Sequence, residues 1–278
     1  MKRTILFIIL LISQLAYAEE WNWQNPVPQG NTLWKTAFYN EWYGYTVGDF
    51  GTIMVTYDQG ATWQLQYEGV TDNLRDLFVA DSITVWAVGD NGTILSTTNG
   101  GAKWNEQSSG VLTGLNSVYF IDHLNGWACG DAKTILRTTD GGSIWEKQTV
   151  PFLTIGSNLN GIFFTTVTEG WCIGLGGTIL HSTDAGISWA PQFTTGQTLL
   201  RIKFFDSVSG LAVGDNGSIY STNNSGTNWT QVTSGTTMGL NDILFVSLTD
   251  FLISGDNGTL LHSTNAGSNW SDQSLSTY

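Results

Sequence analysis

Asp76 and Asp242 are the two carboxylates best placed to support chemistry, and Arg75 and Arg201 lie at neighbouring or matching positions. A pair of carboxyl groups a few ångströms apart can hydrolyse a glycosidic bond. Arginines nearby could hold an anionic substrate through paired hydrogen bonds. The candidates come from three different sequence repeats, and no tyrosine–glutamate nucleophile pair accompanies them. We therefore predict no catalytic residues and keep glycoside hydrolysis as an alternative function.

The histidines and the acidic turns do not favour a metal site. His123, His181 and His262 fall in three different repeats, so a shared metal ion is not expected. Three Asp-Asn-Gly turns, at 90–92, 215–217 and 256–258, lack the full pattern of a calcium loop. The same residues supply the positive φ that a tight hairpin needs. We expect structural turns there, with no metal and no cofactor.

Cys129 and Cys172 are predicted to be free, buried thiols. Cys129 aligns with Val88 of another repeat, whereas Cys172 aligns with Ala87, one position earlier. This offset directs the two side chains to opposite faces of equivalent strands in neighbouring repeats. Disulfide geometry is demanding, so we expect no bridge even in an oxidising compartment.

A repeat of about 41 residues, present six times, must position all of these side chains. A tryptophan near the end of each copy advances by 41, 41, 44, 40 and 41 residues. Each copy holds four short strand candidates, which in the third copy are 115–120, 126–130, 134–138 and 145–148. Four antiparallel strands per repeat predict a blade, and blades bury their faces by stacking in a ring. We predict an all-β propeller in which residues 19–278 form a single domain.

The blade count depends on the segment Trp21-Asn22-Trp23-Gln24. It matches the Trp-x-x-Gln pattern of the fourth strands at 104–107, 145–148 and 270–273. In one interpretation six blades close and this segment is an extra edge strand. In the other it completes a seventh blade whose first three strands are missing. The chain length after residue 18 favours six blades of about 41 residues.

A short turn between the third and fourth strands recurs in every repeat, as in Asp140-Gly141-Gly142-Ser143-Ile144-Trp145. The Asp or Asn folds back onto nearby backbone N–H groups, glycine permits a reversed φ, and tryptophan covers the turn. Burial of one such ring contributes about 4–6 kcal/mol as an upper bound. We expect structural clasps at Asp58/Trp63, Asn99/Trp104, Asp140/Trp145, Asp184/Trp189, Asn224/Trp229 and Asn265/Trp270.

This turn resembles the Asp-box, or bacterial neuraminidase repeat. The longer pattern, Leu-x-x-Val-x-Phe, then Gly-Trp127-Ala-x-Gly, then Thr-Ile-Leu before the box, is similar to the photosystem II assembly/stability factor repeats. The resemblance covers residues 21–273 and implies a propeller of seven blades. Asp-box propellers also include sialidases and other glycosidases. The assembly factors have an arginine-rich face, whereas Arg75, Arg137 and Arg201 are the only arginines after residue 18.

The residues that follow the first Leu of each repeat form a candidate binding ring. In a propeller the first strand lines the channel, and its start faces the same rim as the hairpin between strands two and three. These residues differ from blade to blade, as recognition of an asymmetric partner would require. The candidate binding residues are Trp34, Lys35, Arg75, Asp76, Asn116, Asn160, Arg201, Asn241 and Asp242.

Trp34 and one long loop stand out near this rim. Trp34, like Trp23 and Trp42, falls outside the tryptophan columns of the repeat. Its ring could stack on a sugar or contact a protein loop, or it could be a core position. The loop 149–158 contains Pro151, Phe152, Leu153 and Ile155, and its apolar content suggests a partner contact or a plug over the channel.

Residues 1–18 are typical of a secretory signal peptide. Lys2 and Arg3 precede an apolar run, and Ala16-Tyr17-Ala18 supplies a small-residue cleavage site. Without Lys2 and Arg3, eight basic residues stand against twenty-three acidic ones, which argues against a nucleic-acid partner. We predict an exported, monomeric, non-catalytic propeller without a membrane anchor, located in a periplasm or outside the cell, that binds a protein or glycan partner through one face. The other alternative is a structural repeat module of a larger surface assembly.

Overall fold

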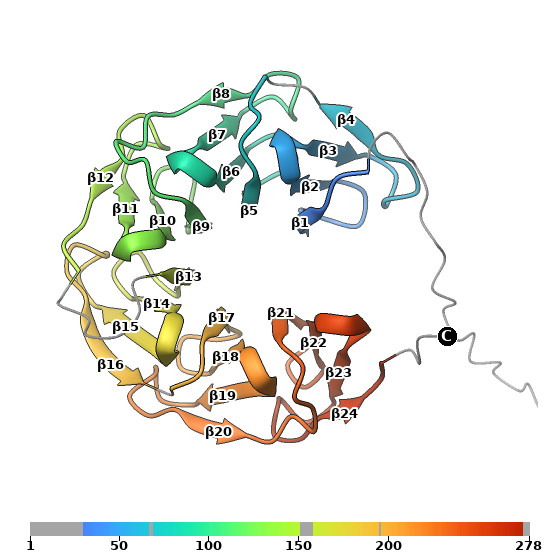
Figure 1. Ribbon diagram of the computed structural model, residues 1–278, viewed down its shortest axis with the longest axis vertical. Coiled ribbons are helices and arrows are strands. Elements are labelled where there is room, and N and C mark those ends of the chain that lie inside the picture. The colour runs from blue at the N-terminus through green and yellow to red at the C-terminus, as the bar shows by residue number, and fades with distance from the viewer. Residues whose placement is uncertain (1–29, 67–68, 151–157, 195, 275–278) are drawn as a thin grey trace, which may run out of the picture.

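Six four-stranded antiparallel sheets form a ring of blades in the computed structural model, which describes residues 30–66, 69–150, 158–194 and 196–274 (Figure 1). This confirms the predicted all-β propeller with six blades. The signal-like start, Trp21–Gln24 and most of the loop 149–158 lie outside the described residues.

Each blade is built from four strands that are consecutive in the chain, with the first beside the channel and the fourth at the outer edge (Figure 1). Blades 1 and 2 contain β1 (Leu33–Phe38), β2 (Gly44–Gly48), β3 (Ile53–Thr56), β4 (Gln64–Gln66), β5 (Leu74–Val79), β6 (Val85–Gly89), β7 (Ile94–Thr97) and β8 (Asn105–Glu106). Blades 3 and 4 contain β9 (Leu115–Phe120), β10 (Gly126–Gly130), β11 (Ile135–Thr138), β12 (Glu146–Lys147), β13 (Leu159–Phe164), β14 (Gly170–Gly174), β15 (Thr178–Ser182) and β16 (Ala190–Thr194). Blades 5 and 6 contain β17 (Leu199–Phe204), β18 (Gly210–Gly214), β19 (Ser218–Thr222), β20 (Thr230–Val232), β21 (Leu240–Phe245), β22 (Phe251–Gly255), β23 (Leu260–Ser263) and β24 (Ser271–Asp272).

A one-turn 3-10 segment joins the second and third strands of every blade. These turns are η1 (Asp49–Gly51), η2 (Asp90–Gly92), η3 (Asp131–Lys133), η4 (Leu175–Gly177), η5 (Asp215–Gly217) and η6 (Asp256–Gly258). The central residue has a positive φ in each, for example 56° at Asn91 and 54° at Asn216. Asn tolerates this left-handed conformation, which agrees with the predicted turn function of the Asp-Asn-Gly sequences.

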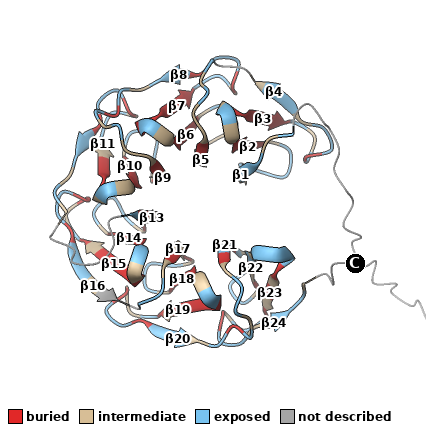
Figure 2. Cartoon of the chain, in the orientation of Figure 1, coloured by how far each residue is buried: buried red, intermediate tan, exposed pale blue. Residues whose placement is uncertain are grey.

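The apolar core lies between the blades. Five clusters of buried side chains each join the second and third strands of one blade to the first strand of the next. In three of them a second-strand tryptophan stacks on a first-strand phenylalanine, namely Trp86–Phe120, Trp127–Phe164 and Trp171–Phe204, with ring centroids 3.5–4.1 Å apart. The middle strands are therefore buried and the outer strands exposed (Figure 2).

The clasp between the third and fourth strands has the same backbone hydrogen bonds in every blade. In blade 3 the Thr138 hydroxyl accepts bonds from the backbone N–H groups of Asp140 and Gly142 at 3.3 and 2.9 Å. The Asp140 carboxylate accepts a bond from the Ile144 N–H at 2.9 Å. These bonds lower the pKa of Asp140. The clasp is therefore a structural turn, as the sequence predicted.

The tryptophan of the clasp remains in the turn, which corrects the prediction that it begins the fourth strand. Trp145 precedes β12 in blade 3, and Trp189 precedes β16 in blade 4. Both rings are buried, at 7% and 5% exposure. The ring must pack inward under the turn to cover it, so this residue stays outside the exposed outer strand.

Trp189 also departs from its counterparts in its hydrogen bond. Its Nε1 donates to the Gly186 carbonyl of its own turn at 3.0 Å, whereas Trp145 donates to a glutamine of the preceding blade. The corresponding glutamine for blade 4 would be Gln148, but its amide donates to the Glu146 carbonyl of its own strand at 2.9 Å. Trp189 therefore closes its own clasp without a polar link to blade 3.

The two cysteines are free and buried, as predicted, but the geometric reason given for this is corrected by the structure. Cys129 and Cys172 lie in the same apolar cluster, between blades 3 and 4. Opposite faces of neighbouring blades are the faces that pack together, so the thiols face each other. Burial, followed by the proximity of Cys172, raises the pKa of the Cys129 thiol.

Candidate functional site

A β-bulge at the start of every first strand creates the candidate site. In blade 2, Leu74 pairs with Gly89 and Asp76 pairs with Val88, so Arg75 is an extra residue in the ladder. The same irregularity occurs in the other five blades. Bulges redirect side chains. The predicted ring is therefore two sets, which we call the bulge ring (Trp34, Arg75, Asn116, Asn160, Leu200 and Asn241) and the channel ring (Lys35, Asp76, Ser117, Gly161, Arg201 and Asp242).

The bulge ring is held against the 3-10 turns at the rim. Four of its members bond to the aspartate that opens the turn of their own blade. The donor–acceptor pairs are Trp34 Nε1 to Asp49 (2.6 Å), Arg75 to Asp90 (2.5 Å), Asn116 Nδ2 to Asp131 (3.0 Å) and Asn241 Nδ2 to Asp256 (2.7 Å).

Bonds between blades also connect the bulge ring. The Arg75 guanidinium donates to the Asn116 Oδ1 at 2.7 Å, and Asn160 Nδ2 donates to the Leu199 carbonyl at 2.9 Å. Hence these side chains are pre-positioned rather than free to sample many rotamers. Trp34 is the large apolar member, and 57% of its surface is exposed.

The channel ring contains two ion-paired carboxylates. Asp242 lies 2.6 Å from Lys35 Nζ and 3.2 Å from Lys203 Nζ. Asp76 lies 3.6 Å from the Arg201 guanidinium and accepts a bond from the Val118 N–H at 3.0 Å. Lys35, Asp76 and Arg201 are therefore inside the channel rather than on the open rim.

Lys203 is a member of this cluster that the sequence reasoning missed. It lies on β17 in a column that elsewhere holds aromatic residues, such as Phe78, Tyr119 and Phe163. Burial lowers the pKa of Lys203, and the charge of Asp242 acts in the opposite direction. A lysine in an otherwise aromatic column is a signal that could have identified it.

The charge state of Asp242 limits the chemistry that this cluster can perform. Burial opposes its ionisation, but Lys35 and Lys203 outweigh that effect and hold the pKa of Asp242 well below its usual range. A glycosidase needs one carboxyl group that keeps its proton at neutral pH. Asp242 is ionised at that pH and cannot be that proton donor.

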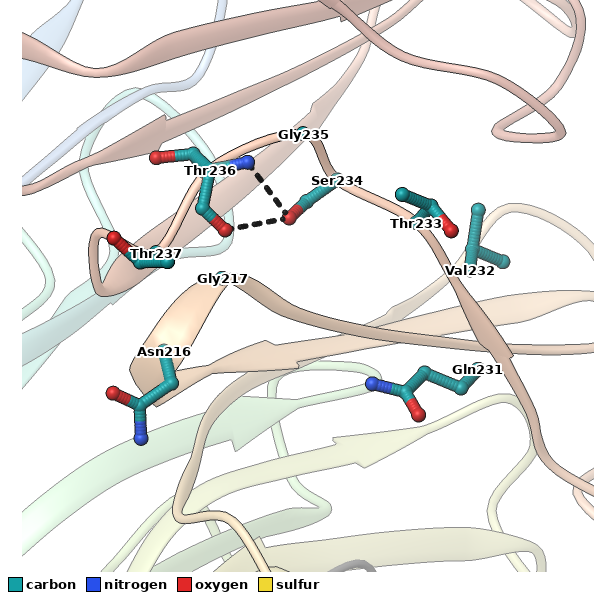
Figure 3. A pocket seen from close by; sticks show the side chains of 9 residues that line it. All are labelled: Asn216, Gly217, Gln231, Val232, Thr233, Ser234, Gly235, Thr236 and Thr237. Atoms are coloured by element: carbon teal, nitrogen blue, oxygen red, sulfur yellow. Dashed lines mark hydrogen bonds between the residues drawn. The ribbon is translucent and has the colours of Figure 1, made fainter.

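Two polar hollows lie beside the rim turns of blades 5 and 2. The larger, about 540 Å³, is lined by η5 and the segment 231–237 (Figure 3). The smaller, about 390 Å³, is lined by η2 and the segment 106–112. In the first, Ser234 Oγ bonds to the backbone of Thr236, and Ser109 bonds in the same way to Val111 in the second. The sequence reasoning missed both, although Ser-Gly-x-x-x-Gly occurs at 109–114 and 234–239.

Neither a metal centre nor a membrane helix occurs in the described ranges. Nowhere in them do three or more His, Cys, Asp or Glu side chains gather as ligands for a metal ion. Within the same ranges there is no helix with the length and apolar content that a bilayer crossing requires.

Six four-stranded blades, each with an Asp-box clasp, define an Asp-box β-propeller. The sequence pattern described as "Photosynthesis system II assembly factor YCF48" matches residues 110–194 and 190–278. The chain belongs to this family, which confirms the resemblance inferred from the repeats. No curated protein sequence matches the chain.

Solved structures of low sequence identity share the fold. "YCF48 bound to D1 peptide" is 20% identical with a TM-score of 0.71, covering 88% of this chain and 81% of that one. YCF48 from Cyanidioschyzon merolae is 18% identical with a TM-score of 0.72, covering 89% and 86%. The GH74 xyloglucanase from Xanthomonas campestris is 15% identical with a TM-score of 0.71, covering 87% of this chain and 45% of that one.

Proposed function

We propose that this protein is an exported, non-catalytic propeller that binds a polypeptide partner through its rim face and assists the assembly of that partner. Family membership supports a binding role, and the related YCF48 has been solved with a D1 peptide bound. The observation that carries the proposal is the bulge ring. It presents a different, pre-positioned side chain from each blade on one face, with Trp34 exposed among them.

The rim charge favours a particular kind of partner. The rim turns and their neighbouring linker contain Asp49, Asp72, Asp90, Asp131, Asp215 and Asp256. The basic residues there, Arg75 and Lys133, are fewer. Complementary charge speeds association and excludes partners of like charge. The partner segment is therefore neutral or basic, with an apolar or aromatic side chain that packs on Trp34.

Export is part of the proposal and rests on the sequence of residues 1–18. The basic start, the apolar run and the small-residue site together are typical of a cleaved signal. The partner is accordingly sought in the cell envelope or the culture medium of the source organism.

A pull-down from the source cell envelope tests the binding role. The bait is residues 19–278, and the test variant is Trp34→Ala/Arg75→Ala, which alters two bulge-ring side chains that lie outside the buried core. A matched control is Ile144→Ser, because Ile144 is equally exposed but lies in a clasp turn, at the opposite end of the strands from the rim. Capture by the native chain and the control, with loss in the test variant, is the expected result.

Two other outcomes would count against the proposal. Equal capture by all three proteins would place the binding surface away from the bulge ring. Absence of any captured protein, combined with hydrolysis of a polysaccharide by the native chain, would replace the binding role with the glycosidase alternative.

A further inference from the structure

The junction between blades 6 and 1 differs from the other five. Leu33, on the face of blade 1 that points toward blade 6, is 45% exposed, whereas its five counterparts in the other blades are at most 1% exposed. Leu260 and Ser254 of blade 6 are also partly or fully exposed, at positions that the other blades bury completely. Among the described residues, no apolar cluster joins these two faces.

The inner end of this junction is nevertheless bridged. Lys35 of β1 and Asp242 of β21 form an ion pair of 2.6 Å across it. Another inner strand between β1 and β21 would separate that pair. The junction therefore has no place for a complete seventh blade in this arrangement, and what needs covering is its outer part, between β4 and β24 (Figure 1).

A glutamine–tryptophan clamp shows how the outer parts of blades are joined elsewhere. Gln66, in β4 of blade 1, accepts a bond from Trp104 Nε1 of blade 2 at 2.9 Å. Gln107 of blade 2 accepts one from Trp145 of blade 3 at 3.1 Å, and its amide donates to the Gly141 carbonyl at 3.0 Å. Gln192 and Trp229 form a longer contact of 3.5 Å between blades 4 and 5.

The clamp glutamine lies three residues after the clasp tryptophan of its own blade in all three cases. Two junctions show what happens without the clamp. Between blades 3 and 4, Trp189 bonds within its own turn. In blade 5, Val232 replaces glutamine, and Trp270 of blade 6 then has a buried Nε1 without a hydrogen-bond partner. The clamp glutamine thus satisfies a donor that otherwise needs a local acceptor or stays buried and unpaired, a costly state.

The same spacing occurs before blade 1. Gln24 lies three residues after Trp21, and Trp21 precedes Leu33 by 12 residues, within the 10 to 14 residues found between clasp tryptophan and next first-strand Leu elsewhere. We propose that Trp21–Gln24 covers the outer part of the junction between blades 6 and 1. Gln24 accepts a hydrogen bond from Trp63 Nε1 and thereby closes the ring. This inference concerns ring closure and is independent of the proposed binding role.

The competing closure uses Gln273, which lies three residues after Trp270. If blade 6 packed directly on blade 1, Gln273 would take the clamp position against Trp63. A double-mutant cycle separates the two arrangements, because it measures the coupling of a chosen pair. The variants are Gln24→Leu, Gln273→Leu and Trp63→Phe in the full chain, with Gln66→Leu and Trp104→Phe as the matched reference pair.

The expected result is coupling between Gln24 and Trp63 equivalent to about a fivefold change in the folding equilibrium constant, similar to the reference pair, with none between Gln273 and Trp63. Additive effects of Gln24→Leu and Trp63→Phe, or coupling of Trp63 to Gln273, would overturn the proposal.

Hydrogen exchange at the Trp63 indole N–H gives a second readout that does not depend on unfolding data. Its NMR signal is assigned by its absence from Trp63→Phe. Exchange should be slow in the native chain and become several-fold faster in Gln24→Leu, while the Trp104 signal is unchanged. Identical exchange at Trp63 in the two proteins would contradict the closure by Gln24.

Discussion

The Arg201 guanidinium of blade 5 lies 3.6 Å from the Asp76 carboxylate of blade 2, which stands across the channel (Figure 1). Both side chains are largely buried. A charged pair thus connects two blades that share no apolar cluster among the described residues. The channel is part of the protein's stabilising structure as well as the floor beneath the bulge ring.

Replacing one member of this pair should be more damaging than replacing both. Arg201→Met should lower the free energy of unfolding by about 2–3 kcal/mol, because it leaves the Asp76 carboxylate buried without its cation. The double variant Asp76→Leu/Arg201→Met should recover part of that loss. Urea denaturation measures both. Arg75→Met is the control, and since Arg75 is at the rim and half-exposed, its loss should cost less than about 1 kcal/mol.

Asp242 should make stability depend on pH in the acid range. Its pKa is depressed in the folded state, so its contribution is complete above the usual value near 3.8 and is lost as pH falls toward the lower folded-state pKa. Asp242→Asn should cost about 1–2 kcal/mol at pH 7, allowing for partial solvent screening. The difference between native chain and variant should shrink below about pH 4. A difference that stays constant down to about pH 2 would contradict the ion pair.

The stack of Trp127 on Phe164 should be a principal contact between blades 3 and 4. Trp127→Ala should lower the free energy of unfolding by about 3–5 kcal/mol, because a cavity replaces a buried ring. Trp127→Leu should cost less than half as much, since Leu211 fills the same position in blade 5. Thermal or urea unfolding of the two variants gives the comparison. Equal losses would show that the aromatic ring has no particular place in this interface.

The facing thiols should remain unreactive until the chain unfolds. Ellman's reagent should label neither Cys129 nor Cys172 in the native chain and both in denaturant, because both are buried. Cys129→Val/Cys172→Ala should change stability by less than about 1.5 kcal/mol, since Val88 and Ala87 occupy these positions in blade 2. A large loss of stability, together with a native mass lacking two hydrogens, would instead indicate a disulfide between the blades.

The elements of the fold could be read from local patterns. The tryptophan column, the Asp-box turn and the alternation within 115–120 and 126–130 each depend on residues that are close in sequence. Strand pairing within a blade is also local, because successive strands are joined by short turns. The sequence therefore predicted six blades, their strands and the clasp residues, and it predicted that the ring after each first Leu differs between blades.

Other features were decided only by the tertiary structure. The bulge that separates Arg75 from Asp76 is a matter of register between two strands, and alternation alone does not reveal it. The same holds for the acceptor of each clasp tryptophan. The repeat pattern gives Trp189 and Trp145 the same position, yet only Trp145 bonds to the preceding blade.

The position of each blade around the ring decided the remaining contacts. It pairs Arg201 with Asp76 across the channel, and it brings Cys129 and Cys172 together because of the face that each blade turns toward its neighbour. Sequence alone determined what each repeat is, because hydrogen bonds and turns within a repeat are local. The structure decided what the repeats do to one another, because contacts between blades join residues about 40 positions or more apart in the chain.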